Sequence, residues 1–346
     1  MSIRLHQLLA GAAPGDAVTD QAFQWRSALD DAGINSDIYA EYVDSRLFGN
    51  VLPLYMLPDD NAGTLLRYSI WSRANWLAAT RPGRLGIVYH NITPARFMRG
   101  SNPVVAELCS RGRRELEQFA SRPDVVVADS TYNAEELLAA GWPDPVIIPL
   151  LQRLPMPPPV RDPVPPTMLY VGRIAPNKRI EDLIMILAHV REHHIPDASL
   201  DLIGNWLEFP IYRAALDELA GRLGVTDVVT FHGHVSNEVR DRAYEEAGAY
   251  VSMSEHEGFC NPPLEAMSRG LPVIVRDAGA VGETTGNAAL LVRDRDIPLA
   301  AAAVARTLTD VRVRHGLAVN ARHRLEEITP EALTPVILQT ISPLLA

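Results

Sequence analysis

Residues 257–265 read Glu-Gly-Phe-Cys-Asn-Pro-Pro-Leu-Glu, and this stretch decides which fold the chain can adopt. The apolar run Ala249 to Met253 before it predicts a buried strand, followed by a loop from Ser254 to Asn261. The two prolines suit the first turn of a helix, where a missing N–H costs nothing, and we expect that helix to stop at Gly270. A strand, a glycine-containing loop and an exposed helix start form an anion-binding site, because several N–H groups and the helix dipole point at one place.

The two glutamates that bound this stretch suit different tasks. Glu265, in the first or second helical turn, can accept hydrogen bonds from vicinal hydroxyls such as those of a ribose. Glu257, at the loop entrance, would lie on the other side of the phosphate position, where a transferable sugar would bind. Alternatively, acidic residues at a helix start serve only its dipole. The spacing alone does not decide, but the whole nine-residue string favours a site.

A second strand, turn and helix follow the same pattern earlier in the chain. Residues 168–171 predict a strand, Gly172 begins a turn, and a helix is expected from Ile180 to Glu192. Of the 32 Lys and Arg residues, only Lys178 in this turn is a lysine. Arg173 can bind phosphate oxygens through two N–H groups, while Lys178 supplies a compact charge. A single lysine can also survive by chance, but its position favours a phosphate-binding role.

Composition bounds the class of protein. The 346 residues suffice for two domains, and 47% hydrophobic with 21% charged residues is typical of a globular protein. A net charge of −10 argues against a nucleic-acid partner. No apolar run reaches the length that spans a bilayer. Cys109 and Cys260 alone imply no disulfide framework, so we expect a reducing cytoplasm.

The predicted elements alternate between strand and helix on both sides of a proline-rich segment. Seven prolines lie between Pro155 and Pro166, so that segment should be a semi-rigid linker. We expect a first α/β domain over 1–151, the linker over 152–166, a second α/β domain over 167–329 and a helix over 330–346 that returns to the first domain. The expected strands are Ile3–Leu9, Asp37–Tyr42, Leu85–Tyr89, Val125–Ala128 and Val146–Leu150, then Met168–Val171, Leu200–Ile203, Val228–Phe231, Ala249–Met253, Val273–Val275 and Ala289–Val292. The fold class is therefore two Rossmann-like, doubly wound parallel sheets, with the active site expected in the cleft between the domains.

The motifs together resemble the retaining glycosyltransferases of family 4, which have the GT-B fold. The resemblance rests on Val171-Gly172-Arg173 with Lys178, on 231–235 (Phe-His-Gly-His-Val), on 255–267, and on 270–274 and 282–284. It covers most of 167–295. The first domain matches more weakly, through Gly15-Asp16-Ala17 and 89–94 (Tyr-His-Asn-Ile-Thr-Pro).

The resemblance implies a role for each site residue. Arg173 and Lys178 would bind the diphosphate of a nucleotide-sugar donor and act in catalysis with Glu257 and His90. Glu265 would bind the ribose, and Glu257 the transferred sugar. The remaining donor-binding positions would be Gly15, Val235, Gly258, Phe259, Cys260 and Asn261. A histidine at a strand end can also be purely structural, so for His90 it is the resemblance that favours a site role.

The chemistry expected from these residues needs no metal and no cofactor. Two cations and a helix start can stabilise the charge of a departing nucleoside diphosphate. We interpret Asp294-Arg295-Asp296 as surface and helix-start acidity rather than a metal site. The resemblance favours front-face attack, in which the acceptor hydroxyl gives its proton to the departing phosphate while the configuration is retained.

The acceptor and the sugar are less constrained. The 89–94 string and Cys260 are similar to bacterial enzymes that add mannose- or rhamnose-type sugars from GDP donors to surface polysaccharides or glycolipids. Five arginines between Arg96 and Arg114 form either an electropositive face for an anionic membrane or an ordinary solvated surface. UDP-sugar-dependent glycosylation of small molecules, a GT-B sugar-nucleotide epimerase and a non-catalytic sensor remain alternatives. A nicotinamide oxidoreductase is disfavoured, since no Gly-x-Gly-x-x-Gly follows an expected strand.

Overall fold

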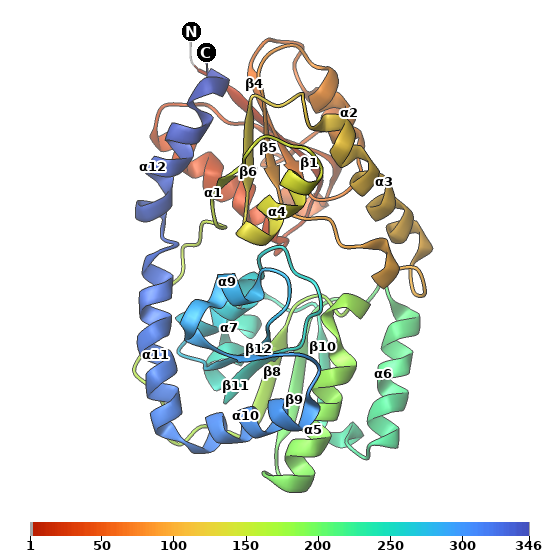
Figure 1. Cartoon of the computed structure of the whole chain (residues 1–346), viewed down its shortest axis with the longest axis vertical. Coiled ribbons are helices and arrows are strands. Elements are labelled where there is room, and N and C mark those ends of the chain that lie inside the picture. Colours follow the sequence, from red (N-terminus) through yellow and green to blue (C-terminus); the bar gives the residue numbers. More distant parts are fainter. Residues whose placement is uncertain (1–2, 346) are drawn as a thin grey trace. The chain divides into compact units, whose positions relative to one another are not determined.

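The structure is a computed structural model that describes residues 3–345. The chain forms two compact units, each built on one sheet (Figure 1). Unit 1 runs up to Ala95, continues over Val104–Arg153 and takes in the chain from Glu327 on. Unit 2 comprises Arg96–Pro103 and Leu154–Glu326. The predicted linker, 152–166, therefore contains a boundary between the units, and it holds neither helix nor strand.

Unit 1 contains a seven-stranded parallel sheet in the order β3-β2-β1-β4-β5-β6-β7. Its strands are β1 (Leu5–Ala12), β2 (Ile38–Val43), β3 (Leu52–Pro53), β4 (Gly63–Tyr68), β5 (Leu85–Tyr89), β6 (Val125–Ala128) and β7 (Val146–Ile147). The strand order reverses between β1 and β4. In doubly wound sheets, ligands bind beyond the carboxyl ends of the strands at such a reversal.

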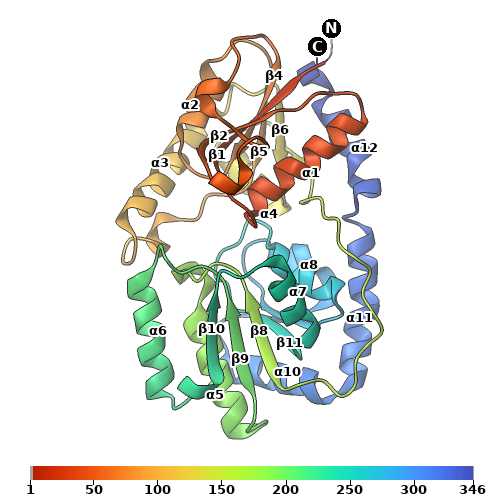
Figure 2. The same ribbon diagram turned by 180° about the vertical axis from the view of Figure 1, so that it is seen from behind.

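The helices of unit 1 are α1 (Ala17–Asp31), α2 (Arg73–Thr80), α3 (Pro103–Phe119), α4 (Thr131–Ala139) and α12 (Pro330–Ile341). α12 lies beside α1, as Figures 1 and 2 both show, and the short helix after it packs on β4. Glycine makes this close approach possible: a Cβ on Gly63 would lie 2.2 Å from the carbonyl oxygen of Leu344. The end of the chain is thus part of unit 1.

Unit 2 contains a six-stranded parallel sheet in the order β10-β9-β8-β11-β12-β13. Its strands are β8 (Thr167–Val171), β9 (Ser199–Ile203), β10 (Val229–Gly233), β11 (Ala249–Ser252), β12 (Val273–Arg276) and β13 (Ala289–Val292). The order reverses between β8 and β11, which are hydrogen-bonded neighbours.

Helices cover both faces of this second sheet (Figure 2). They are α5 (Ile180–His193), α6 (Pro210–Arg222), α7 (Asn237–Glu246), α8 (Asn261–Ser268), α9 (Val281–Thr285), α10 (Ile297–Thr309) and α11 (Val311–Glu326). α5, α6 and α10 bury one apolar core against the sheet. α7 contacts β8, α8 and α9 contact β12, and α11 packs on α8. The predicted class of two doubly wound parallel sheets is therefore confirmed.

Several boundaries and elements differ from the sequence prediction. β1 begins and ends later than the predicted 3–9, because the apolar run continues to Ala12. β3, β4 and α2 were not predicted at all. α8 ends at Ser268, before the expected stop at Gly270. Gly270 has φ +72°, and the bonds from its N–H to the Met267 carbonyl and from Leu271 N–H to the Ala266 carbonyl close the helix.

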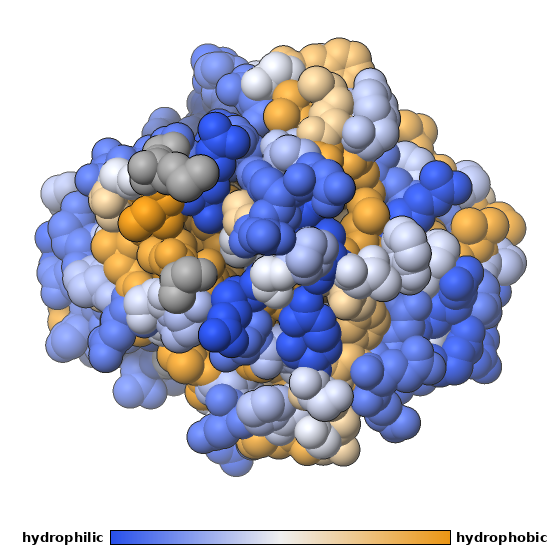
Figure 3. Space-filling view, turned by 90° about the horizontal axis from the view of Figure 1, so that it is seen from above, coloured by the Kyte–Doolittle hydropathy of each residue, from blue (hydrophilic) through white to orange (hydrophobic). Residues whose placement is uncertain are grey.

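One face of the described chain has the mixture of side chains usual for globular proteins. The face drawn in Figure 3 intersperses hydrophilic and hydrophobic side chains. Among residues 3–345, no helix combines the length and the apolar character that crossing a membrane would require.

Candidate functional site

The loops after β8 and β11 carry the main predicted site residues of unit 2. Because β8 and β11 are neighbours at the reversal of strand order, their carboxyl ends open side by side. Arg173 and Lys178 follow β8, and Glu257 follows β11. The fold thus brings the predicted cations and the predicted sugar-binding carboxylate to one edge of one sheet.

Lys178 and Glu257 are bound to each other. Lys178 Nζ lies 2.6 Å from Oε1 and 2.7 Å from Oε2 of Glu257, and the two side chains are only 17% and 11% exposed. Buried Asn177 links the same two loops. Its side-chain Nδ2 donates to the His256 carbonyl, and its backbone carbonyl accepts from Glu255 N–H. The sequence predicted separate ligands for these two side chains, and it did not predict that they would pair.

A glycine supports Glu257 from behind. A Cβ on Gly279 would lie 2.5 Å from the Glu257 carbonyl oxygen, and Gly279 has φ +58°. Ala280 N–H donates to that same carbonyl at 3.0 Å. The segment before α9 therefore fixes the backbone at Glu257, and any side chain at position 279 would push the loop away.

The start of α8 lies next in the chain. Cys260 is its N-cap and has left-handed backbone angles, φ +89° and ψ +82°. Thr284 Oγ1 donates to the Phe259 carbonyl at 2.5 Å, which holds the loop down. Pro262 and Pro263 carry no N–H, so this turn offers fewer donors than an ordinary helix start. Desolvation and the nearby Glu257 carboxylate raise the pKa of the Cys260 thiol, which keeps it a neutral part of the loop.

Arg173 is held more loosely than Lys178. Its guanidinium lies 3.1 Å from Glu208 Oε2 and 5.6 Å from the ring centre of Phe209. Both side chains of the Arg173–Glu208 pair are nearly half exposed, at 42% and 47%. Exchanging one partner for another costs little at such a surface position, so Arg173 can turn to a ligand.

Glu265 and Val235 lie on the same edge of unit 2. Glu265 is in the second turn of α8, where it accepts a hydrogen bond from Tyr244 Oη at 3.1 Å and lies 3.8 Å from Arg240 Nε. Burial, and then the Glu265 carboxylate, raise the pKa of Tyr244, so this phenol stays a donor. Val235 follows β10, the edge strand. The sequence had indicated neither Tyr244 nor Arg240.

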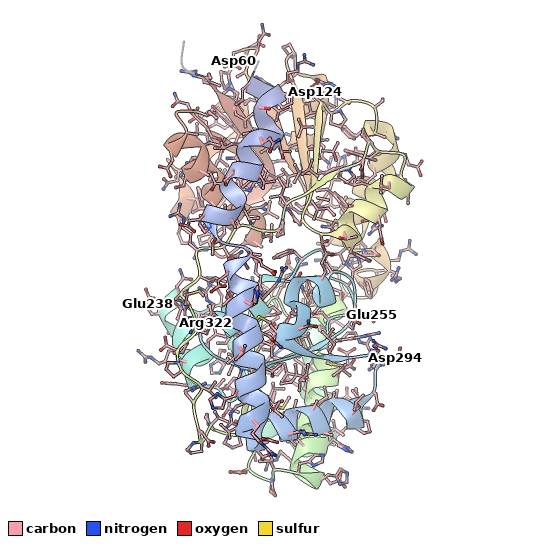
Figure 4. The ribbon with its side chains drawn as sticks, turned by 60° about the vertical axis from the view of Figure 1, so that its left-hand side comes forward. Asp60, Asp124, Glu238, Glu255, Asp294 and Arg322 are labelled. Carbon is pink, nitrogen blue, oxygen red and sulfur yellow. The ribbon has the colours of Figure 1, made fainter. Side chains whose placement is uncertain are left out.

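Two residues of the Asp294-Arg295-Asp296 segment, Arg295 and Asp296, have structural roles. Asp296 caps α10, accepting from Leu299 N–H at 2.9 Å, and Arg295 binds buried Asp182. Asp294 is labelled in Figure 4. Within the described part of the chain, no three His, Cys, Asp or Glu side chains are placed to hold a metal ion.

Gly15 and His90 lie at the carboxyl edge of the sheet in unit 1. Gly15 has φ +77°, which favours glycine, and a Cβ there would meet only open space. Asp16 then caps α1, accepting from Thr19 N–H at 2.9 Å. His90 directly follows β5, and its Nδ1 lies 2.7 Å from Oδ2 of Asp129, which directly follows β6. The side chains of this pair are 3% and 2% exposed.

The loop after His90 is tied to α3 and α4. Asn91 has φ +68°, and its Nδ2 donates to Asn133 at 2.9 Å and to Glu136 at 3.1 Å. Arg113 binds the same Glu136 and donates to the Ile92 carbonyl. His90 therefore leaves its strand through a loop that is cross-linked on both sides.

A charged side chain that the sequence analysis missed lies inside unit 1. Arg67, near the end of β4, is 0% exposed. It donates to Gln7 Oε1 at 2.7 Å and to Gln21 Oε1 at 2.6 Å, and it stacks on Trp25 at 4.6 Å. Burial lowers the pKa of Arg67 to about 9, against the opposing effect of Asp129. The guanidinium thus remains charged at neutral pH.

The five arginines for which the sequence left open an electropositive face or an ordinary solvated surface have different surroundings. Arg113 and Arg114 are paired with Glu136 and Glu107. Arg111 is exposed and stacks on Trp71, while Arg96 and Arg99 are exposed and belong to unit 2. Two of the five charges are therefore neutralised by neighbours.

Comparison with known proteins shows the fold and a partial match to a glycosyltransferase family. Residues 157–324 match the family model described as glycosyl transferases group 1. The Anabaena protein HepE in complex with UDP and glucose has the same fold, with a TM-score of 0.78 at 16% identity, covering 98% of this chain and 99% of that one. The fold is thus GT-B, as predicted, and the findings support a glycosyltransferase.

Two curated relatives resemble part of the chain. An uncharacterized glycosyltransferase of Methanocaldococcus jannaschii is 34% identical over 116 residues, which are 34% of this chain and 28% of the relative. A GDP-mannose-dependent alpha-mannosyltransferase of Mycolicibacterium smegmatis is 32% identical over 114 residues, 33% of this chain and 26% of the relative. The aligned segments span less than a third of these two proteins.

Proposed function

We propose that the chain is a retaining glycosyltransferase of family 4 that moves a hexose from a nucleotide-diphosphate sugar to a hydroxyl acceptor. The observation that carries the proposal is the Lys178–Glu257 pair at the reversal of strand order, next to the start of α8. A shielded cation beside a helix start suits a diphosphate, and a carboxylate beside it suits sugar hydroxyls.

The unliganded pair implies an exchange of partners on donor binding. The donor diphosphate would take Lys178 Nζ from Glu257, and Arg173 would turn from Glu208 to the same phosphates. Glu257 would then accept hydrogen bonds from the hydroxyls of the transferred sugar, so its carboxylate oxygens would keep hydrogen-bond partners. Glu265 would bind the ribose, the backbone of 258–261 the phosphates and sugar, Val235 the base, and Gly15 would give the loop after β1 room to approach the phosphates.

The proposed reaction needs no metal ion, because Arg173, Lys178 and the α8 start stabilise the leaving diphosphate. The acceptor hydroxyl passes its proton to the departing phosphate on the face from which that phosphate leaves. His90 orients the reacting groups. Full turnover after treatment with EDTA is expected, and loss of turnover that Mg²⁺ restores would contradict the metal-independent scheme.

A GDP donor with mannose or a rhamnose-type sugar is the proposed substrate, and polysaccharide or glycolipid synthesis the proposed context. The name of the mycobacterial relative supports GDP-mannose, whereas UDP and glucose in HepE support the alternative of a UDP-sugar. A thermal-shift screen of GDP- and UDP-sugars separates the two, since a donor at a hundred times its Kd adds about 2.7 kcal/mol of stability.

A transfer assay separates a transferase from an epimerase or a sensor. Free nucleoside diphosphate should appear only when an acceptor is present, and proton NMR of the product should show the anomeric configuration of the donor. A cytoplasmic location stays a prediction. So does contact of the Arg96–Arg114 stretch with the inner face of an anionic membrane. Flotation with anionic and neutral liposomes tests it.

A further inference from the structure

The His90–Asp129 pair of unit 1 contains two buried polar atoms that their mutual hydrogen bond does not use. Within residues 3–345, neither His90 Nε2 nor Asp129 Oδ1 has a hydrogen-bond partner, although both atoms are buried. A buried polar atom without a partner costs about 1–3 kcal/mol. Such atoms call for a functional explanation, and His90 already follows a strand at the ligand-binding edge of its sheet.

Two neighbours present positive charge to Asp129. Ser130 caps α4, accepting from Asn133 N–H at 3.2 Å, so Asp129 immediately precedes the positive end of a helix dipole. Burial lowers the pKa of the Arg67 guanidinium, and the attraction of Asp129 opposes that effect. Asp129 is therefore the anion that partly balances Arg67.

A carboxylate can only accept hydrogen bonds, so the atom facing it must carry hydrogen. In a neutral imidazole, hydrogen on Nδ1 leaves Nε2 as an acceptor. We infer that Asp129 is a positioning residue that holds His90 as the Nδ1–H tautomer, so that Nε2 accepts a hydrogen bond from a substrate hydroxyl. The inference rests on the proposed function only for the identity of that substrate.

The surroundings make this orientation rigid. The cross-links of Asn91 to Asn133 and Glu136 hold the backbone that follows His90. His90 N–H itself donates to the Tyr68 carbonyl at 3.0 Å, which fixes the backbone at the ring. A group whose backbone and ring are both held loses little entropy when it binds, as preorganised sites require.

Unit 1 also contains a matched control. His6 Nε2 lies 3.2 Å from Asp60 Oδ2, and the His6 side chain is 1% exposed. This pair lies at the amino edge of the sheet, at the start of β1, and Figure 4 shows Asp60 at the same end of unit 1 as Asp124, which precedes β6. It differs from the His90 pair in the edge of the sheet, in the ring nitrogen that is used, and in a carboxylate that is 32% exposed and also binds Arg81.

The first test reads the tautomer without any substrate. The full chain is labelled with ¹⁵N-histidine, and long-range ¹H–¹⁵N spectra at neutral pH show which ring nitrogen carries hydrogen. His90→Gln identifies the His90 signals. We expect the Nδ1–H tautomer in the wild type and a shift toward Nε2–H in Asp129→Asn, because an amide can donate to Nδ1. His90 as Nε2–H or imidazolium in the wild type overturns the inference.

The second test compares turnover. Asp129→Asn should lower kcat by roughly 5- to 150-fold, the fold-change that corresponds to about 1–3 kcal/mol when a buried group loses its hydrogen-bond partner. The donor KM should change less than about 3-fold, since donor binding is assigned to unit 2. Asp60→Asn should leave kcat unchanged. Losses of kcat in both variants that follow their losses of Tm would assign Asp129 a structural role and overturn the inference.

Failure of this inference can be distinguished from failure of the proposed function. If no donor and acceptor support turnover, the proposed function fails while the wild-type spectrum still decides the tautomer. If Asp129→Asn does not fold, the wild-type spectrum again decides, and Asp129→Glu, which keeps the charge, should retain the Nδ1–H tautomer. A Glu variant with the Nε2–H tautomer contradicts the role of the carboxylate.

Discussion

The two sheets carry charge at their carboxyl edges in different ways. In unit 2, Arg173 and Lys178 lie on loops within a few residues of a glycine, 42% and 17% exposed. In unit 1, Arg67, His90 and Asp129 have almost completely buried side chains, and Arg67 is part of a strand. Arg173 can exchange its partner cheaply at the surface, and Lys178 would leave Glu257 only for another anion, whereas the fully buried charges of unit 1 are costly to uncouple. The difference indicates that the edge of unit 2 is suited to binding a charged ligand, and the edge of unit 1 to holding side chains in a fixed orientation.

The largest effect is expected from removing the shielded cation of unit 2. Lys178→Ala should lower kcat by about 10²- to 10³-fold, or roughly 3–4 kcal/mol, because the leaving diphosphate loses a fixed positive charge. The variant should also unfold more easily, since Glu257 is left buried without its partner. Steady-state kinetics and thermal melts measure the two effects.

A double variant separates these two effects. Lys178→Met combined with Glu257→Gln removes both charges, so the free energy of unfolding should return to within about 1 kcal/mol of the wild type. Turnover should stay low. If turnover recovers together with stability, the pair serves only the fold, and unit 2 does not differ from unit 1 in the way described above.

The same contrast explains what the sequence could predict. Gly172 and Lys178 lie close together in the chain, and 257–265 is one continuous string, so strand, turn and helix signals were enough to locate each group by itself. The pairing of Lys178 with Glu257 was not predicted, because it depends on β8 and β11 being neighbours across 79 residues.

The interior of unit 1 was less accessible to sequence reasoning. β4 reads Gly-Thr-Leu-Leu-Arg-Tyr, and the sequence analysis predicted no strand there. Only the fold shows that hydrogen bonds to Gln7 and Gln21 offset part of the free-energy cost of burying Arg67. Asp129 lies 39 residues from His90, and only the β5–β6 pairing brings them together. Asp129 directly after an apolar strand was the one available signal.

A smaller effect is expected at the proposed ribose site. Glu265→Gln should raise the donor KM about 10-fold with little change in kcat, because hydrogen bonds to a charged acceptor contribute roughly 1.5–3 kcal/mol and an amide keeps part of them. Tyr244→Phe is the control, since it removes the hydrogen bonds of the phenol to Glu265 and to the Pro262 carbonyl but leaves the Glu265 carboxylate in place. An equal rise of KM in both variants would mean that Glu265 supports α7 rather than the donor.

Each edge also contains a non-glycine residue with left-handed backbone angles, and glycine substitutions compare the two. Cys260→Gly should stabilise the chain by about 0.5–1 kcal/mol. Glycine relieves the strain of φ +89°, and this gain exceeds the loss that comes from the greater freedom of glycine in the unfolded chain. Asn91→Gly should destabilise it, because two side-chain hydrogen bonds disappear. Thermal melts of both variants measure the difference. A destabilised Cys260→Gly would show that the thiol contributes more than its strained backbone costs.

The smallest effect is expected at the exposed pair of unit 2. Glu208→Gln keeps the shape of the side chain but frees Arg173 from a competing charge, so the donor KM should fall about 2- to 3-fold, in line with surface pairs of roughly 0.2–1 kcal/mol. The gain should shrink at high salt, because salt already weakens the pair. Arg84 and Asp124 form a surface pair at the amino edge of unit 1, and Asp124→Asn is the control that should leave KM unchanged. An unchanged KM in Glu208→Gln would mean that Arg173 does not exchange partners, and the contrast between a receiving edge and a fixed edge would then rest on Lys178 alone.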